Sequence, residues 1–373
     1  MMITPPASVG MSLQDVDTPC LLVDLDAFER NVEKLGDFVQ RHGVRLRAHA
    51  KTHKSADIAK YQIEKGGACG VCCQKVSEAE ALVNAGITDI LVSNQVVAPN
   101  KIERLAALAR RARILVCVDD IGNVADLSQA AARAGATIEC LVEIDVGAGR
   151  CGVMPGEQAV QIAQRIAGMA GLTFAGLQAY HGSAQHVRDF AERKRLIADA
   201  IAQTALTVRM LKERGLSCDI VAGAGTGTFQ LEAISGVYNE LQCGSYIFMD
   251  VDYGQVRDEA GGFISEFENS LFIYTSVMSK TRPETAVCDA GLKAQSVDSG
   301  LPRIFGRDDI EYVKCSDEHG VISDPNNVLH LNDKLQLIPG HCDPTVNLYD
   351  WFVAVRHGRV EALWPVTARG MVP

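Results

Sequence analysis

Four basic side chains occupy every second position of one short segment: Arg45, Arg47, His49 and Lys51. Alternate residues of a strand share a face, so these side chains would point to the same side. Burying several cations without counter-charges is very costly. The segment is therefore either exposed or faces a polar cavity that holds an anion, and we favour the cavity because its other face is small and apolar.

Lys51 ends this row, and His53 and Lys54 follow it closely. Cationic neighbours and burial both favour a neutral amine over an ammonium, and a neutral lysine amine is the form that makes a Schiff base. A solvated basic loop is the simpler alternative. The alternation and the position at a strand end favour the reactive lysine.

Glu143 and Asp145 show the same alternation on another expected strand. They could balance the two arginines inside the protein, or form ion pairs with a purely structural role. The glycine-rich segment 147–153 follows them and presents one arginine, Arg150. A guanidinium on such a loop suits an oxyanion or a phenolate.

The segment Gly223 to Thr228 contains three glycines and two threonines directly after an expected strand. Its backbone N–H groups and hydroxyls could cradle an anion. The third glycine of a dinucleotide-binding motif is missing, so the loop predicts a single phosphate group rather than NAD. A tight turn that needs glycine is the alternative. Gly244 and Ser245 end the next strand, where a barrel would add them to the same phosphate site.

His341 and Asp343 flank Cys342 near the end of the sequence. An extended backbone would place the imidazole and the carboxylate on the same side. One nitrogen and one hard oxygen, completed by water and substrate, suit Mg²⁺ or Mn²⁺ better than a closed zinc site. A surface pair without a metal is the alternative.

Helical patterns alternate with short apolar runs through the first two thirds of the sequence, which is typical of parallel strands joined by helices. Eight strands are expected, at residues 44–50, 70–73, 90–94, 114–119, 139–145, 174–180, 220–223 and 240–244. Eight parallel strands indicate a closed (β/α)8 TIM barrel, whose chemistry lies at the C-terminal ends of the strands.

The later part of the sequence has strand-like runs without long helices, which indicates a smaller, mainly β domain. The run Cys20 to Leu25 has strand propensity and could pair with this domain. We therefore expect the barrel at 26–262, and a β domain formed by 1–25 and 263–373 that carries His341 and Asp343.

Composition narrows the class of protein. The 373 residues are 47% hydrophobic and 22% charged, enough for a sizeable core. A net charge of -10 argues against a nucleic-acid or anionic-membrane partner. No apolar run resembles a signal peptide or a membrane span, and the twelve cysteines lack a repeated spacing. These features are typical of a soluble enzyme in the reducing cytoplasm.

Together these motifs resemble the D-threonine aldolase and D-serine dehydratase group of pyridoxal-phosphate enzymes, which has the alanine racemase fold. The matching motifs span nearly the whole chain, at residues 17–19, 49–51, 70–75, 149–153, 178–182, 225–227 and 341–344. The resemblance implies pyridoxal 5′-phosphate (PLP) as cofactor. It implies that Lys51 binds PLP covalently, that Arg150 and Tyr180 contact its ring, and that its phosphate lies among Gly225, Thr226, Gly227, Gly244 and Ser245.

The metal pair divides this group, because dehydratase members carry His-x-Cys and aldolase members carry His-x-Asp. His341 and Asp343 therefore imply an aldolase that uses Mg²⁺ or Mn²⁺. The segments 289–302, 314–320 and 341–351 look most like the branch that reversibly cleaves 3-hydroxyaspartate to glycine and glyoxylate.

This reaction requires a base for the β-hydroxyl proton, and His181 or a metal-bound hydroxide could provide it. It also requires a cation for the second substrate carboxylate. Arg47, His53, Lys54 and Lys293 are possible providers.

Four other functions remain open from the sequence. D-Threonine aldolase is the nearest, followed by dehydration of D-serine or 3-hydroxyaspartate. A non-catalytic PLP carrier would use the same barrel and lysine but generally lacks the second domain. An alanine-type racemase would need a tyrosine on the opposite face of the cofactor. The resemblance also implies a homodimer.

Overall fold

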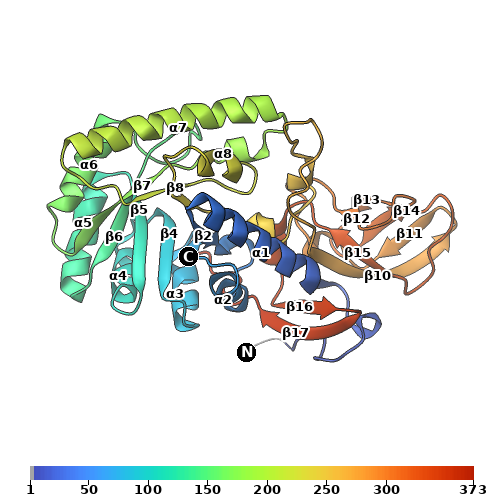
Figure 1. Ribbon diagram of the computed structural model, residues 1–373. Coiled ribbons are helices and arrows are strands. Elements are labelled where there is room, and N and C mark those ends of the chain that lie inside the picture. Colours follow the sequence, from blue (N-terminus) through green and yellow to red (C-terminus); the bar gives the residue numbers. More distant parts are fainter. Residues whose placement is uncertain (1–3) are drawn as a thin grey trace.

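The computed structural model describes residues 4–373 and consists of a parallel barrel beside a large mixed sheet (Figure 1). Eight parallel strands close the barrel in sequence order, which confirms the expected fold class. They are β2 (Arg45–His49), β3 (Gly70–Cys73), β4 (Asp89–Gln95), β5 (Arg113–Val118), β6 (Ile138–Glu143), β7 (Leu172–Gln178), β8 (Ile220–Gly223) and β9 (Glu240–Leu241).

Helices surround this barrel and connect its strands (Figure 1). They are α1 (Leu25–His42), α2 (Ala56–Glu64), α3 (Val76–Asn84), α4 (Pro99–Leu108), α5 (Ile121–Ala134), α6 (Glu157–Ala167), α7 (Phe190–Glu213) and α8 (Phe229–Ala233). Helix α1 illustrates how the sequence sets their ends. Asp24 accepts a hydrogen bond from the Ala27 N–H at its start, and Gly43 takes the left-handed conformation at its end.

The second sheet has the strand order β13-β14-β11-β10-β1-β16-β17; off this path, β15 pairs with β10, and β12 pairs with β15. Its strands are β1 (Cys20–Asp24), β10 (Leu271–Arg282), β11 (Thr285–Cys288), β12 (Arg303–Ile304), β13 (Glu311–Cys315), β14 (Gly320–Ser323), β15 (Lys334–Ile338), β16 (Trp351–Arg356) and β17 (Arg359–Pro365). As expected, β1 joins this sheet, antiparallel to β10 and parallel to β16.

The sequence predicts strands of this sheet at residues 272–278, 285–289, 334–338, 351–356 and 359–364, but it does not predict β12 to β14. β12 has only two residues, and a register irregularity between Tyr312 and Lys314 interrupts the alternation of β13. Such irregularities remove the period-two pattern by which a strand is recognised. The domain division at 26–262 and 263–373 remains a prediction, and the first residues of the 1–25 segment lie outside the described residues.

From Leu46 to His49, strand β2 is buried on both faces, as its sequence pattern predicts, whereas Arg45 at its start is exposed. Leu46 and Ala48 belong to the apolar core shared with α1 and the second sheet. Arg47 and His49 are buried as well. The inside of the barrel between them holds an apolar layer made of Cys72, Leu91, Leu115, Cys117, Leu141, Ala175, Ile220 and Ala222.

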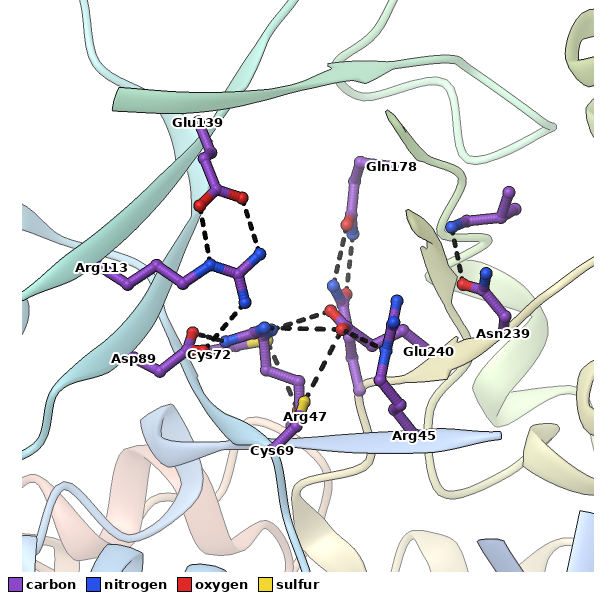
Figure 2. A network of polar contacts seen from close by, with 12 residues as sticks. Arg45, Arg47, Cys69, Cys72, Asp89, Arg113, Glu139, Gln178, Asn239 and Glu240 are labelled. Carbon is purple, nitrogen blue, oxygen red and sulfur yellow. Dashed lines mark hydrogen bonds and ion pairs between the residues drawn. The ribbon is translucent and has the colours of Figure 1, made fainter. Parts of the chain in front are cut away.

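Figure 2 shows a polar network in which Arg47 lies between Glu240 and Asp89. Its Nε is 2.8 Å from Glu240 Oε1, and Nη1 pairs with Asp89. Arg45 binds the same glutamate, with 3.2 Å between Nε and Oε2. Arg113 extends the network from Asp89 to Glu139 (Figure 2).

This network corrects two expectations from the sequence. Glu143 does not balance Arg45 or Arg47, because it accepts a hydrogen bond from Gln95 and lies near Arg150. The two arginines are neutralised by carboxylates of the protein, so that half of the basic row does not mark a site for an anionic ligand.

Within the described residues, no helix is both long and apolar enough to cross a membrane.

Candidate active site

A cavity of about 320 Å³ lies at the C-terminal ends of the barrel strands, the end where a TIM barrel carries its chemistry. Its lining comes from almost every strand end. The lining residues are His49, Lys51, Thr52, Gln74, Ser93, Arg150, Gln178, Tyr180, Gly182, His186, Gly225, Thr226, Gln242, Gly244, Ser245 and Tyr253.

Lys51 lies in a single 3-10 turn that follows β2 directly. Its side chain is 40% exposed to the cavity, and Nζ forms an ion pair with Asp343 Oδ2. Burial lowers the pKa of Lys51, but the carboxylate of Asp343 outweighs burial and leaves the pKa above its ordinary value. The expectation of a neutral amine is therefore wrong for this state of the protein, because the decisive neighbour is an acid from the distant β domain.

The expected phosphate loop lines the cavity through Gly225 and Thr226. A Cβ at Gly225 would lie 2.5 Å from Gln185 Oε1, and one at Gly244 would lie 2.6 Å from Thr52 Oγ1. A side chain at either position would therefore force these neighbouring side chains to move. Thr226 Oγ1 is buried and has no hydrogen-bond partner among the described residues. An unpaired hydroxyl in a glycine-lined cradle suits a phosphate, which accepts hydrogen bonds.

The remaining members of the expected cradle are divided between two cavities. Gly244 and Ser245 line the main cavity together with Gly225 and Thr226. Gly227 instead lines a neighbouring cavity of about 220 Å³ on the other side of the loop, and its N–H donates to Gln185 Oε1. Its position indicates a role in shaping the loop.

Arg150 and Tyr180 lie together at the cavity, as a site for an aromatic cofactor ring requires. The guanidinium carbon of Arg150 is 5.7 Å from the centre of the Tyr180 ring. His49 lines the same cavity, and its Nε2 is 2.9 Å from Gln74 Nε2. Burial holds the pKa of His49 well below its ordinary value, so this imidazole is neutral.

His186, which the sequence analysis did not select, also lines this cavity, and its side chain is 43% exposed. Its Nδ1 is 2.5 Å from Asp252 Oδ2, and Arg188 binds the other carboxylate oxygen. Burial raises the pKa of Asp252, but hydrogen bonds from His186 and Arg188 outweigh it and lower the pKa to about 2. The only signal in the sequence is a histidine two residues before an arginine, which is too common to mark a site.

His181, one of the two bases considered from the sequence, does not line the cavity. It is 4% exposed, and its Nδ1 is 3.3 Å from Ser183 Oγ. Its other ring nitrogen lies against Gly147, where a Cβ would be 2.6 Å from Nε2. This placement gives His186, and not His181, direct access to a molecule in the cavity.

His341 and Asp343 approach the cavity from the β domain, but their backbone is not extended throughout. A short helix, α9 (Cys342–Val346), begins directly after His341. The expected extended geometry is therefore wrong, because the capping conformation of His341 is followed by a helical turn. Cys342 is buried, and its Sγ lies 3.3 Å from the main-chain oxygen of Met249.

The donor atoms of this pair suit an open metal site. His341 Nδ1 lies 2.8 Å from Asp298 Oδ2, which leaves Nε2 as the nitrogen for coordination. Asp343 Oδ1 is buried without a hydrogen-bond partner among the described residues. Among all the residues that the structure describes, no three or more His, Cys, Asp or Glu side chains lie together so that they could hold a metal ion. Two protein ligands would leave the other positions to water and substrate.

The four cations considered for a second substrate carboxylate lie elsewhere. Arg47 belongs to the barrel network, and His53 is fully buried. Lys54 pairs with Glu78, and Lys293 is an exposed partner of Glu318. None of them lines the cavity. The basic side chains that do line it, besides Lys51 and the neutral His49, are Arg150 and His186.

Comparison with known proteins identifies both parts of the chain. Residues 23–252 match the family model for the alanine racemase N-terminal domain, and residues 270–355 match that for the putative serine dehydratase domain. A 3-hydroxy-D-aspartate aldolase from Paracoccus denitrificans (strain Pd 1222) is 56% identical over 368 residues, covering 98% of this chain and 95% of that protein. A D-threonine aldolase from an Arthrobacter species is 48% identical over 370 residues, covering 99% and 97%.

The solved structures agree with this assignment. The crystal structure of D-threonine aldolase from Filomicrobium marinum superposes with a TM-score of 0.96 at 50% identity, covering 99% of this chain and all of that one. D-threo-3-hydroxyaspartate dehydratase from Delftia sp. HT23 has a TM-score of 0.83 at 24% identity, covering 95% and 98%, and shows the shared fold. The chain therefore belongs to the alanine racemase family of barrels, in the branch that combines this barrel with a serine dehydratase domain and includes the 3-hydroxy-D-aspartate and D-threonine aldolases.

Proposed function

We propose that the protein is a carbon–carbon lyase that reversibly cleaves 3-hydroxyaspartate to glycine and glyoxylate with PLP and a divalent metal ion. The 56% identity to a 3-hydroxy-D-aspartate aldolase over nearly the whole chain supports this substrate. The observation that carries the reaction type is the contact between Lys51 and Asp343. It joins the cofactor end of the barrel to the expected metal pair in one site.

The residues present fit PLP. Lys51 would hold it covalently, the loop at Gly225 and Thr226 with Ser245 would receive its phosphate, and Arg150 and Tyr180 would border its ring. Bound PLP supplies an electron sink that makes the Cα–Cβ bond of an amino acid cleavable. The protein then has to bind and orient the substrate and remove one proton from its β-hydroxyl.

His186 is the base that we propose for this proton. Asp252 binds Nδ1 and so fixes the tautomer, which leaves the lone pair of Nε2 available to accept a proton. Arg188 keeps Asp252 ionised through its own ion pair. A histidine oriented by a carboxylate is the arrangement that other enzymes use for general-base catalysis.

The metal assignment stays a proposal, with His341 and Asp343 as its two ligands. Mg²⁺ or Mn²⁺ bound there would increase the acidity of a hydroxyl that it coordinates. Asp343, and not a cysteine, stands two residues after His341, as in the His-x-Asp pair of the aldolases. Cys342, between the two, is buried with its Sγ 3.3 Å from the main-chain oxygen of Met249.

D-Threonine aldolase is the second candidate, because a D-threonine aldolase is 48% identical to this chain. The two reactions differ in whether the β-substituent carries a carboxylate or a methyl group. Arg150 lines the cavity and provides a positive charge that a carboxylate needs and a methyl group does not. This favours 3-hydroxyaspartate as the better substrate.

Product analysis tests the proposal. The purified protein is given PLP and Mn²⁺ or Mg²⁺, with 3-hydroxyaspartate, D-threonine and D-serine in separate reactions. Glyoxylate and glycine from 3-hydroxyaspartate, lost with EDTA and restored by Mn²⁺, are expected. Acetaldehyde formed faster from D-threonine would make the second candidate correct. Oxaloacetate or pyruvate would show dehydration. If no substrate gave a product, the protein would instead be a non-catalytic PLP carrier.

We further propose that the enzyme acts in the cytoplasm as a homodimer. The homodimer is proposed because the chain resembles other enzymes of this fold. Light scattering of the purified chain should give twice the mass of 40.2 kDa. A single-chain mass would contradict the dimer.

A further inference from the structure

A buried carboxyl group lies behind the glycine-rich loop and has no role in the chemistry described so far. Glu232, on α8, is 2% exposed. Its Oε1 accepts a hydrogen bond from the Thr228 hydroxyl over 2.8 Å, whereas Oε2 has no hydrogen-bond partner among the described residues. An ionised carboxylate in such a place would be strongly destabilised, because one of its oxygens has neither water nor a donor.

Two further hydrogen bonds connect this carboxyl group to the loop. The Thr228 hydroxyl accepts a hydrogen bond from Gln185 Nε2 at 2.8 Å. Gln185 Oε1 in turn accepts one from the backbone N–H of Gly227 at 3.1 Å. Because a Cβ at Gly225 would also collide with Gln185, this glutamine sets the position of the loop segment that lines the main cavity.

Among the residues that the structure describes, no cation forms an ion pair with Glu232. Burial is the largest cause that raises the pKa values of Tyr180, Tyr238 and Cys243, and Glu232 adds a smaller rise to each. The charged residues around the neighbouring cavity are Arg193, Asp258, Glu259 and Glu266. Arg193, the one cation in that set, donates to the main-chain oxygens of Val187, Arg188 and Arg257.

We propose that Glu232 is a positioning residue that acts as a neutral acid: it holds the loop at 225–228 through Thr228 and Gln185, and its ionisation weakens the loop's hold on a phosphate monoester. The phosphate of PLP is the expected occupant, so the inference rests on the proposed function. Ionisation would place an uncompensated negative charge behind a loop that binds a dianion, and like charges repel strongly in a water-poor interior.

The pH at which this happens is accessible to experiment. Burial raises the pKa of Glu232 to about 8. The carboxyl group is therefore mostly protonated near neutral pH and mostly ionised in alkaline buffer. Each pH unit above the pKa changes the protonated fraction about tenfold, which sets the scale of the expected loss of affinity.

Release of PLP from the full-length holoenzyme tests the proposal. Wild type and Glu232→Gln are compared at about pH 7 and about pH 9.5, because glutamine keeps the acceptor for Thr228 and cannot ionise. At neutral pH the two should release PLP equally fast. In the alkaline buffer wild type should release it about 30-fold faster than the variant, because pH 9.5 lies about 1.5 units above the pKa of Glu232. Comparison at the same pH cancels the titration of PLP and Lys51, which both proteins share.

Two matched variants separate positioning from general charge effects. Glu266→Gln removes a carboxylate across the neighbouring cavity and should behave as wild type. Thr228→Val breaks the connection and should speed up release at both pH values, whereas Thr228→Ser should restore wild-type release. Equal release from wild type and Glu232→Gln in alkali, or a Glu266→Gln variant that behaves like Glu232→Gln, would overturn the proposal.

The result is independent of which substrate the enzyme cleaves. A protein that retains PLP as described but forms no glyoxylate would refute the aldolase function alone. A protein that forms glyoxylate but shows no difference between wild type and Glu232→Gln would refute the role of Glu232 alone. Inorganic phosphate, titrated into PLP-free full-length protein at the same two pH values, should show the same difference in affinity.

Discussion

Lys51 of the barrel and Asp343 of the β domain form an ion pair although 292 positions separate them in the sequence. Lys51 is held by the turn after β2, and Asp343 by the first turn of α9. Burial raises the pKa of Asp343, but Lys51 outweighs burial and lowers it to about 2. The carboxylate is therefore ionised at any pH at which the enzyme would work, and is ready to bind a cation.

The first prediction concerns this carboxylate. Asp343→Asn keeps the size of the side chain but removes its charge, so both the ammonium of Lys51 and the metal lose a partner. Metal-assisted stabilisation is worth several kcal/mol, so kcat for glyoxylate formation should fall at least about 10²-fold. Added Mn²⁺ should not restore it. The control is Asp350→Asn, which removes a surface partner of Arg369 and should leave the rate unchanged.

The second prediction distinguishes the two candidate bases. His186→Gln should lower kcat about 10²–10⁴-fold, because general-base catalysis is typically worth that much. His181→Gln should have a much smaller effect, because His181 lies outside the cavity. Steady-state kinetics with 3-hydroxyaspartate checks both variants. A loss in His181→Gln as large as that in His186→Gln would contradict the assignment of the base.

The carboxylate that orients this histidine gives the third prediction. Asp252→Asn leaves an amide beside His186 and Arg188 and no longer fixes the Nδ1–H tautomer. The rate should fall by a smaller factor than in His186→Gln, and the double variant should be no slower than His186→Gln alone, since both act through one imidazole. Additive losses in the double variant would show that Asp252 acts independently.

The fourth prediction concerns the barrel network. Arg47→Met leaves Glu240 and Asp89 without their buried partner, and breaking such a pair typically costs about 3–5 kcal/mol. Urea unfolding should show this loss in the free energy of unfolding. Arg104→Met removes a partly exposed pair with Glu80 and should cost less than about 1 kcal/mol. Equal losses in the two variants would mean that burial does not strengthen the network.

The fifth prediction is a pH dependence of stability. The pKa of Glu232 rises from its ordinary value of 4.5 to about 8 in the folded protein, mainly through burial. Between these values the native state keeps a proton that the unfolded chain releases, so the free energy of unfolding falls as the pH rises. Each pKa unit is worth about 1.4 kcal/mol. Glu232→Gln should therefore gain stability relative to wild type from about pH 5 to about pH 8. Parallel curves for the two proteins would contradict a raised pKa.

The sequence by itself determined the barrel and the main residues of its cavity. The eight strands follow from short apolar runs that alternate with helical patterns. The alternation within β2 shows which of its side chains share a face. Lys51, Arg150, Tyr180 and Gly225 could be selected because each lies at a strand end or in a glycine-rich loop. These signals are local, since period and turn chemistry depend on near neighbours in the chain.

Only the tertiary structure decided which partner each charged residue has. Arg47 could have paired with Glu143, but barrel closure brings Glu240 beside it. His186 enters the cavity and the nearby His181 does not, because the turn between them directs the two rings differently. Lys51 is charged because Asp343 of the β domain lies beside it and forms an ion pair with it. Electrostatic interactions depend on distance in space, which local sequence patterns do not encode.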